Sequence, residues 1–165
     1  MEVNTVSLVV SIIALLVSVF VFFQLKDKDT TLPDSFSTRP LQLQAYERLV
    51  LLCERIALPN LITRLSQPGL TVREMQVFLI ETIKQEYEYN ASQQIYVSQQ
   101  AWEAVRNLRD QNMLAINSIA KTLSPDAKAS ELNREIIGSL MSEENAALHT
   151  YVSDTLNAEA KKIMK

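Results

Sequence analysis

Apolar residues are most concentrated near the start of the sequence. Residues 6–23 read VSLVVSIIALLVSVFVFF, eighteen positions without a charged side chain, and apolar residues extend this run to Val3 and Leu25. A helix over residues 3–25 would be roughly 34 Å long, enough to cross a hydrocarbon core of about 30 Å. The pattern therefore predicts a transmembrane helix at residues 3–25, in contact with the lipid bilayer.

Two other interpretations compete for this run. A cleavable signal peptide has a basic segment, a shorter apolar core and small residues at its cleavage site. Here Glu2 is the only charged residue before the core, and the core ends in the bulky sequence FFQL at residues 22–25. A buried helix of a soluble domain normally has a polar face, which this run lacks. An uncleaved transmembrane helix is the interpretation that we favour.

Lysine and arginine lie on only one side of the predicted span. None precedes it, whereas Lys26, Lys28 and Arg39 follow within about 15 residues. Because the side richer in Lys and Arg stays in the cytoplasm, we expect a single-pass protein of the cell (inner) membrane with its N-terminus outside. The single cysteine, Cys53, agrees with a cytoplasmic C-terminal part, since one thiol cannot form an internal disulfide.

Small and polar residues recur along one side of the predicted span. They are spaced three and four positions apart and are Asn4, Ser7, Ser11, Ala14 and Ser18. Small side chains at this spacing allow two membrane helices to approach closely, and hydroxyl groups can bond across the contact. Alternatively, each serine bonds a carbonyl one turn back in its own helix. This seam is the candidate transmembrane contact for self-association.

The remaining chain has the pattern of an all-helical protein. Only two glycines occur in 165 residues, and the five prolines fall where the helical period breaks. Residues 26–40 are polar and predict a linker, and residues 41–165 predict one cytoplasmic helical domain with a core of its own. The predicted fold class is all-α, an N-terminal single transmembrane helix followed by a cytoplasmic bundle of about four to six helices. The helices expected in that bundle cover residues 41–57, 60–65, 71–89, 98–123, 130–141 and 144–163.

Two of these helices, at 41–57 and 71–89, are apolar around most of their circumference and should be central. The second begins with a capping box, in which the Thr71 side chain accepts from the Glu74 amide and the Glu74 side chain returns to Thr71. Between residues 90 and 97 no helical period is visible, and we expect a connection that packs Ile95 and Tyr96 inward.

The predicted helix at 98–123 has an apolar stripe that Asn112 interrupts. A single polar residue in such a stripe can fix the register of a helical assembly. It can equally bond a carbonyl within the domain, and this is the interpretation that we favour. Further along, we expect Tyr151 to face the interior from the last helix.

Charge and side-chain chemistry exclude several classes of function. The net charge is −3, and positive and negative residues are interspersed. The sequence therefore has no cluster of basic residues of the kind that binds nucleic acid. His149 is the only histidine, and Ala146 stands where a Glu-x-x-His metal pair would need glutamate. Cys53 lies among leucines, where a buried, unreactive thiol is favoured over a nucleophile. We therefore predict no catalytic residues, no metal and no cofactor, and we do not expect an enzyme.

Residues 86–102 combine aromatic rings with amide side chains, a mixture typical of recognition surfaces. The candidate interaction residues are Tyr87, Asn90, Gln94, Tyr96 and Trp102. Two interpretations remain for them: a binding surface, or a polar connection between helices whose rings complete the core, which we favour. A rival hypothesis is a small-ligand receptor or enzyme with a pocket near Tyr87–Trp102.

Three stretches of the chain resemble a known family. They are PLQLQAYERLVLLCERI at residues 40–56, PNLITRL at 59–65 and EYEYNASQQIYVSQQAW at 86–102. On these stretches the chain resembles a family of single-span bacterial membrane proteins, seen in the Bacteroidota, that is itself a domain of unknown function. The resemblance implies a bacterial protein with an anchor followed by helices, and it supplies no catalytic residue, cofactor or named partner.

The function that these patterns favour is a membrane-anchored, non-enzymatic helical module. Such a module would act as a scaffold or a regulatory and interaction subunit of a membrane complex, through a protein partner or through self-association. The anchor, the helical domain, the small-residue seam and the missing catalytic constellation support this hypothesis.

Overall fold

The protein is described here by a computed structural model that covers residues 13–22, 38–140 and 143–165. Within these ranges the chain forms helices and turns, and it contains no strand apart from an isolated bridge between Thr71 and Lys128. The predicted all-α class is confirmed for this part of the chain. The chain divides into two units, Met1–Ser37 and Thr38–Lys165.

In the first unit, residues 13–22 form a helical segment whose residues are all exposed. No helix within the described ranges is both long enough and apolar enough to cross a membrane. The rest of the predicted span at 3–25 lies outside those ranges, as do most of the predicted linker and the seam residues Asn4, Ser7 and Ser11. The other two seam residues, Ala14 and Ser18, lie one helical turn apart in the described segment.

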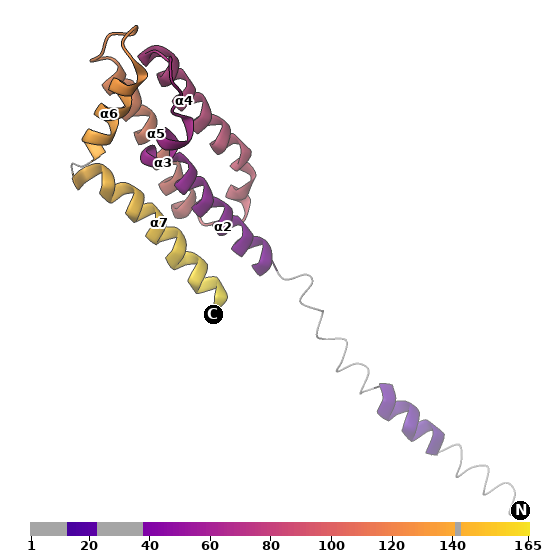
Figure 1. The fold of residues 1–165 in the computed structure, drawn as a ribbon. Coiled ribbons are helices and arrows are strands. Elements are labelled where there is room, and N and C mark those ends of the chain that lie inside the picture. Colours follow the sequence, from indigo (N-terminus) through magenta and orange to yellow (C-terminus); the bar gives the residue numbers. More distant parts are fainter. Residues whose placement is uncertain (1–12, 23–37, 141–142) are drawn as a thin grey trace, which may run out of the picture. The chain divides into compact units, whose positions relative to one another are not determined.

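The second unit is a helical bundle (Figure 1). Helix α2 packs along α7, α4 packs along α5, and α6 lies across α4 and α5. The bounds are α2 Arg39–Ile56, α3 Leu58–Leu65, α4 Val72–Tyr89, the 3-10 helix η2 Ala91–Ile95, α5 Gln99–Ala120, α6 Ala129–Leu140 and α7 Glu143–Met164.

Local chemistry explains where two of these helices begin. At α4 both bonds of the predicted capping box are present: the Glu74 amide donates to Thr71 Oγ1 over 3.3 Å, and the Thr71 amide donates to Glu74 Oε2 over 2.8 Å. The bonds that the amide and then the hydroxyl of Thr71 donate to the carboxylate lower the pKa of Glu74. Pro59 lies in the first turn of α3, where a proline amide is not needed. Helix α3 consequently starts at Leu58, slightly earlier than the sequence predicts.

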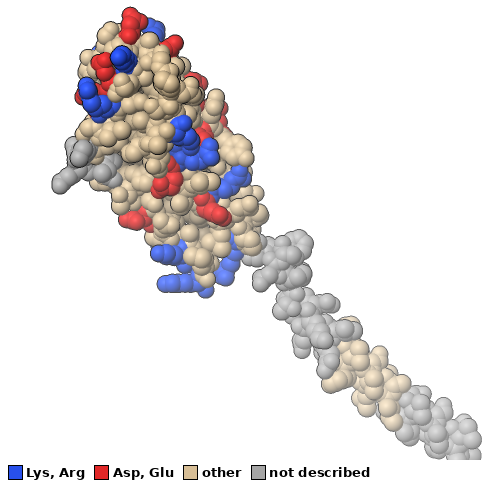
Figure 2. Space-filling view, viewed as in Figure 1, with Lys and Arg blue, Asp and Glu red and all other residues tan. Residues whose placement is uncertain are grey.

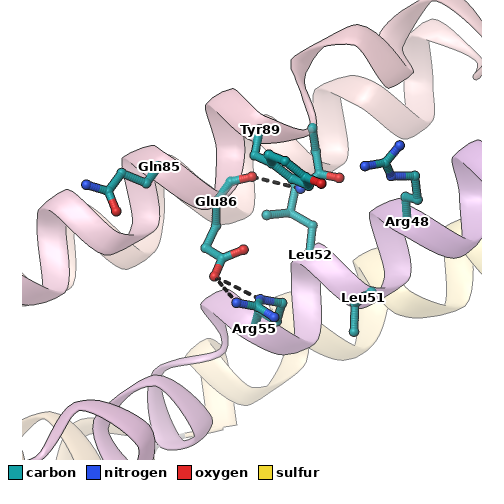
Figure 3. A pocket seen from close by; sticks show the side chains of 8 residues that line it. Arg48, Leu51, Leu52, Arg55, Gln85, Glu86 and Tyr89 are labelled. Carbon is teal, nitrogen blue, oxygen red and sulfur yellow. Dashed lines mark hydrogen bonds and ion pairs between the residues drawn. The ribbon is translucent and has the colours of Figure 1, made fainter.

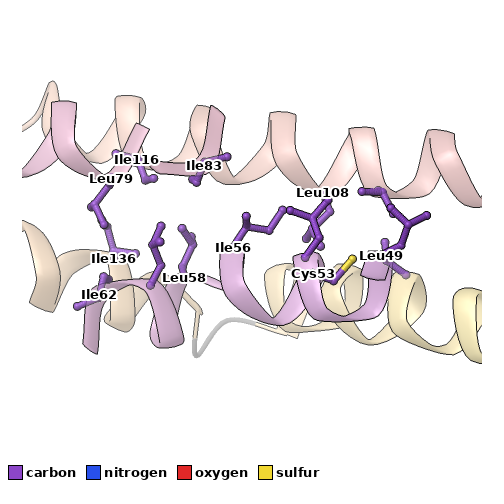
Figure 4. Close-up of a cluster of buried hydrophobic side chains, with 14 of the residues drawn as sticks. Leu49, Cys53, Ile56, Leu58, Ile62, Leu79, Ile83, Leu108, Ile116 and Ile136 are labelled. Carbon is purple, nitrogen blue, oxygen red and sulfur yellow. The ribbon is translucent and has the colours of Figure 1, made fainter. Parts of the chain in front are cut away.

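The core lies between the helices and is filled by leucine and isoleucine side chains (Figure 4). Leu49, Leu52 and Ile56 reach it from α2, and Leu79 and Ile83 reach it from α4. The prediction that these two helices are central is confirmed, since each buries one face in the core. Their outward faces are mostly polar but also carry apolar side chains, and there Leu51 and Val77 are exposed.

The connection after α4 differs from the prediction, because it is a 3-10 helix. With about three residues per turn, Asn90 and Gln93 share the inward side of η2, and both are buried. Ile95, two positions further on, therefore points outward and is 74% exposed, and Tyr96 also reaches the surface. The expectation that Ile95 and Tyr96 pack inward was wrong. Tyr151 on α7 is likewise exposed rather than buried.

Asn112 bonds within the domain, as predicted. Its Nδ2 donates to the carbonyl oxygen of Ile56 over 2.9 Å. Ile56 is the last residue of α2, where carbonyl groups lack a partner within their own helix. The side-chain amide of Asn112, on α5, therefore supplies a hydrogen-bond donor to a carbonyl at the end of α2.

Candidate functional site

A groove lies between α2 and α4 on the surface of the bundle, and we call it the α2–α4 groove. It has a volume of about 570 Å³. Four of its residues follow the i, i+3, i+4, i+7 spacing of one helical face on α2, and the other four lie on the last turns of α4 or just after it. The lining residues are Arg48, Leu51, Leu52, Arg55, Gln85, Glu86, Tyr89 and Asn90.

An ion-pair cluster closes one end of the groove (Figure 3). Glu86 Oε1 accepts from Arg55 Nε over 2.8 Å and lies 2.6 Å from Arg55 Nη2. Arg64 from α3 stands 3.6 Å from the same oxygen and donates to the Arg55 carbonyl over 3.2 Å. Bonding to Glu86 raises the pKa of Arg55. The cluster joins α2, α3 and α4 and fixes the width of the groove at this end.

At the other end, an arginine lies against an exposed aromatic ring. The guanidinium carbon of Arg48 is 5.4 Å from the centroid of the Tyr89 ring, within the range of a cation–π contact. Tyr89 is 73% exposed, and Leu51 between the two ends is exposed as well. The groove thus presents an apolar and aromatic surface between two guanidinium groups.

Two of the predicted interaction residues pack against each other rather than against solvent. The rings of Tyr87 and Trp102 have centroids 5.1 Å apart, and the guanidinium carbon of Arg109 lies 4.1 Å from the centroid of Tyr87. Both rings are partly buried against the core. Arg109 also pairs with its sequence neighbour Asp110, with Nη2 2.6 Å from Oδ1.

The other three predicted interaction residues lie apart from that pair. Asn90 is buried and lines the α2–α4 groove, with its Nδ2 donating to the Glu86 carbonyl over 2.8 Å. Gln94 is exposed on η2, and Tyr96 lines a different hollow near the end of α7. The structure therefore distributes the five residues over four places.

No curated protein and no solved structure matches the chain. Residues 3–163 match DUF7935, a family of unknown function. The chain belongs to the DUF7935 family. The match includes both the apolar N-terminal run and the helical bundle, so the family is defined by the two parts together.

The side chains of this DUF7935 protein that could carry out chemistry are dispersed or buried. Cys53 is 1% exposed, and burial raises the pKa of its thiol to about 12, which keeps it protonated at neutral pH. His149 Nε2 lies 3.5 Å from a carboxylate oxygen of Glu54. Among the residues that the structure describes, no three His, Cys, Asp or Glu side chains gather in a way that could hold a metal.

Sequence reasoning missed the contacts that shape the groove of this DUF7935 protein. In the structure Arg48 lies over Tyr89, and the carbonyl of Arg55 accepts from Arg64. The helical spacing of Arg48, Leu51 and Arg55 could have indicated a mixed polar and apolar face on α2. Their partners on α4 carry no sequence signal that identifies them.

Proposed function

We propose that this protein is a membrane-anchored helical module without enzymatic activity, which serves as a scaffold or regulatory subunit of a membrane complex. The observation that carries this proposal is the apolar run at residues 3–25 joined to a bundle that fills its own core. A rival, a small-ligand receptor with a pocket near Tyr87–Trp102, has less support, because the two rings stack on each other and Asn90 and Tyr96 line separate hollows.

The anchor is supported by the chemistry of residues 13–22. This helical segment exposes large apolar side chains on all sides, among them Leu15, Phe20 and Phe22. Exposure of so much contiguous apolar surface to water is unfavourable by about 25 cal/mol per Å². A lipid environment removes that cost, and a helix is the form in which a single segment satisfies its backbone there. The Lys and Arg residues that follow the run support an outside N-terminus.

Topology is tested by cysteine accessibility in intact cells. A cysteine at position 2 should react with a membrane-impermeant thiol reagent, and a cysteine at position 34 should react only after the cells are opened. The native Cys53 is buried and should add little background. The reverse labelling pattern would contradict the orientation, and extraction of the protein by alkaline carbonate would contradict the anchor itself.

Self-association through the anchor forms part of the proposal. Ala14 and Ser18 lie one turn apart on the described helical segment, and small side chains at this spacing allow close approach of two helices in lipid. The seam from Asn4 to Ser18 is the surface through which we propose that two copies associate.

The α2–α4 groove is the surface that we assign to a protein partner. Tyrosine and arginine are enriched at the residues that contribute most to protein interfaces, and Leu51 and Tyr89 offer apolar area between Arg48 and Arg55. Because Glu86 neutralises only part of the arginine charge of this region, the groove favours a partner segment with apolar and acidic side chains.

Co-purification with matched variants tests this assignment. Leu51→Asp and Tyr89→Ala should each abolish recovery of a stoichiometric partner from detergent-solubilised membranes, because they remove the apolar surface of the groove. Leu114→Asp is the control, since Leu114 is exposed to the same extent as Leu51 but lies on α5. Equal recovery with all three variants would contradict a role for the groove.

A further inference from the structure

We propose that the end of the bundle at which α7 terminates docks on an anionic lipid surface, an inference that rests on the membrane anchor proposed above. We call this end the α7 tip. Its exposed residues combine basic and apolar side chains and are Ile95, Tyr96, Lys161, Lys162, Met164 and Lys165.

Three segments that are distant in sequence meet at the α7 tip. Residues from the start of α2, from the connection after η2 and from the last turns of α7 line one hollow of about 460 Å³, among them Gln42, Tyr96 and Lys162. Tyr46 ties the segments together, since its hydroxyl donates to Glu159 Oε2 over 2.5 Å and accepts from the Ser98 amide over 3.1 Å. The tip is therefore a fixed surface rather than a frayed helix end.

The charge of the α7 tip is positive. Lys161, Lys162 and Lys165 are exposed, and they outnumber the nearby carboxylate of Glu159, which accepts the bond from Tyr46. Figure 2 shows basic side chains gathered at this end of the bundle, while acidic and basic side chains mix at the opposite end. Anionic headgroups attract basic groups held within a Debye length of the membrane surface.

Apolar side chains accompany this charge. Ile95 and Met164 are largely exposed, and Tyr96 reaches the surface beside them. In surfaces that lie on a membrane, apolar side chains enter the boundary between headgroups and acyl chains, and the lysine stems extend along it toward the headgroups. Tyrosine is favoured at that boundary, since its ring is apolar and its hydroxyl is polar.

The covalent chain joins the bundle to the anchor at this same end. Figure 1 shows that α2 begins at the end of the bundle where α7 terminates. Residues 23–37 precede α2, and fifteen residues span at most roughly 50 Å. Tethering over so short a distance keeps the local concentration of lipid high, so a weak surface interaction suffices.

The sequence by itself gives no sign of this surface. Next to the predicted span, Lys26 and Lys28 alternate with Asp27 and Asp29, and their charges cancel. The basic groups of the α7 tip lie at the far end of the chain, and only the packing of α7 along α2 brings them to the start of the bundle.

The test uses the full chain in lipid nanodiscs of phosphatidylcholine, with or without phosphatidylserine. A fluorophore is attached through Gln94→Cys beside the tip, and the lipids carry a headgroup quencher. We expect stronger quenching in the discs that contain phosphatidylserine, and loss of this difference at high salt. A fluorophore attached through Ser130→Cys, at the opposite end of the bundle, should show no dependence on phosphatidylserine.

Two triple variants with equal change of charge serve as a matched pair. Lys161→Gln with Lys162→Gln and Lys165→Gln should abolish the phosphatidylserine-dependent quenching. The control replaces Lys121, Lys128 and Arg134, exposed at the other end, by glutamine and should retain it. Melting temperatures equal to that of the unchanged chain establish that both variants fold.

The possible failures are distinguishable. A chain that enters neutral discs but shows no phosphatidylserine-dependent quenching near Gln94, or triple variants that behave alike, would overturn the docking and leave the anchor intact. A chain that does not enter neutral discs would contradict the anchor, and the docking would fall with it.

Discussion

Replacing Leu52 by alanine should lower the free energy of unfolding of the bundle by about 2–5 kcal/mol. Leu52 is 1% exposed and lies in the core beside Leu49 and Ile56, so truncation removes apolar burial and leaves a cavity. Urea denaturation of residues 38–165, the unit that contains this core, measures the effect as a shift of the unfolding midpoint.

The neighbouring residue provides the control. Leu51 has the same side chain in the same helix but is 57% exposed, so Leu51→Ala should cost under about 1 kcal/mol. Leu79→Ala and Val77→Ala form a second pair of this kind on α4, with Leu79 buried and Val77 exposed. Similar midpoint shifts within either pair would show that the side of the helix facing the core has been misassigned.

Removing the hydroxyl of Tyr46 should destabilise the bundle by about 1–3 kcal/mol. Tyr46 is 3% exposed, and its hydroxyl joins α2 to the Ser98 amide and to Glu159 of α7. Tyr46→Phe keeps the ring but leaves that amide and that carboxylate without this partner. Thermal melting measures the loss, and Tyr151→Phe, at an exposed position, should leave the melting temperature unchanged.

A double-mutant cycle separates the bond from the packing of the ring. Glu159→Ala should cost less in the Tyr46→Phe background than in the unchanged protein, because the bond between the two residues is already lost. Additive costs would mean that the bond to Glu159 contributes nothing to stability.

The same hydroxyl gives a pH dependence with a defined sign. Burial, and then bonding to Glu159, raises the pKa of Tyr46 above its ordinary value of 10.0. A group whose folded pKa is raised stabilises the fold fully below its unfolded pKa, and the contribution is lost as pH rises through the folded pKa. The difference in melting temperature between the unchanged protein and Tyr46→Phe should therefore shrink above about pH 10. A difference that grows in this range would contradict the assignment.

Local signals in the sequence anticipated the start of α4 well. The capping box at Thr71 and Glu74 is complete within four consecutive residues, so no distant part of the chain is needed to form it. Pro59 acts just as locally and separates α2 from α3. The 3-10 geometry of η2 is harder to foresee, because its only sequence signal is the loss of helical period, and this is why the direction of Ile95 was missed.

The candidate site was much less predictable than the helices. Residues 86–102 drew attention because rings and amides are concentrated there, yet the structure engages Tyr87 and Trp102 with each other. The α2–α4 groove depends instead on pairs such as Arg55 with Glu86, which are 31 residues apart. Neither member of that pair is distinctive within its own helix.

The sequence by itself determined the all-α class, the ends of several helices and the division into an apolar N-terminal run and a polar, helix-forming remainder. These properties depend on hydrophobic period and on chemistry within a few residues. Only the tertiary structure decided which face of an apolar helix is covered, as with Leu52 and Leu51, and which basic groups gather at the α7 tip. Such outcomes depend on the packing of segments distant in sequence, and the pattern within one helix does not contain that information.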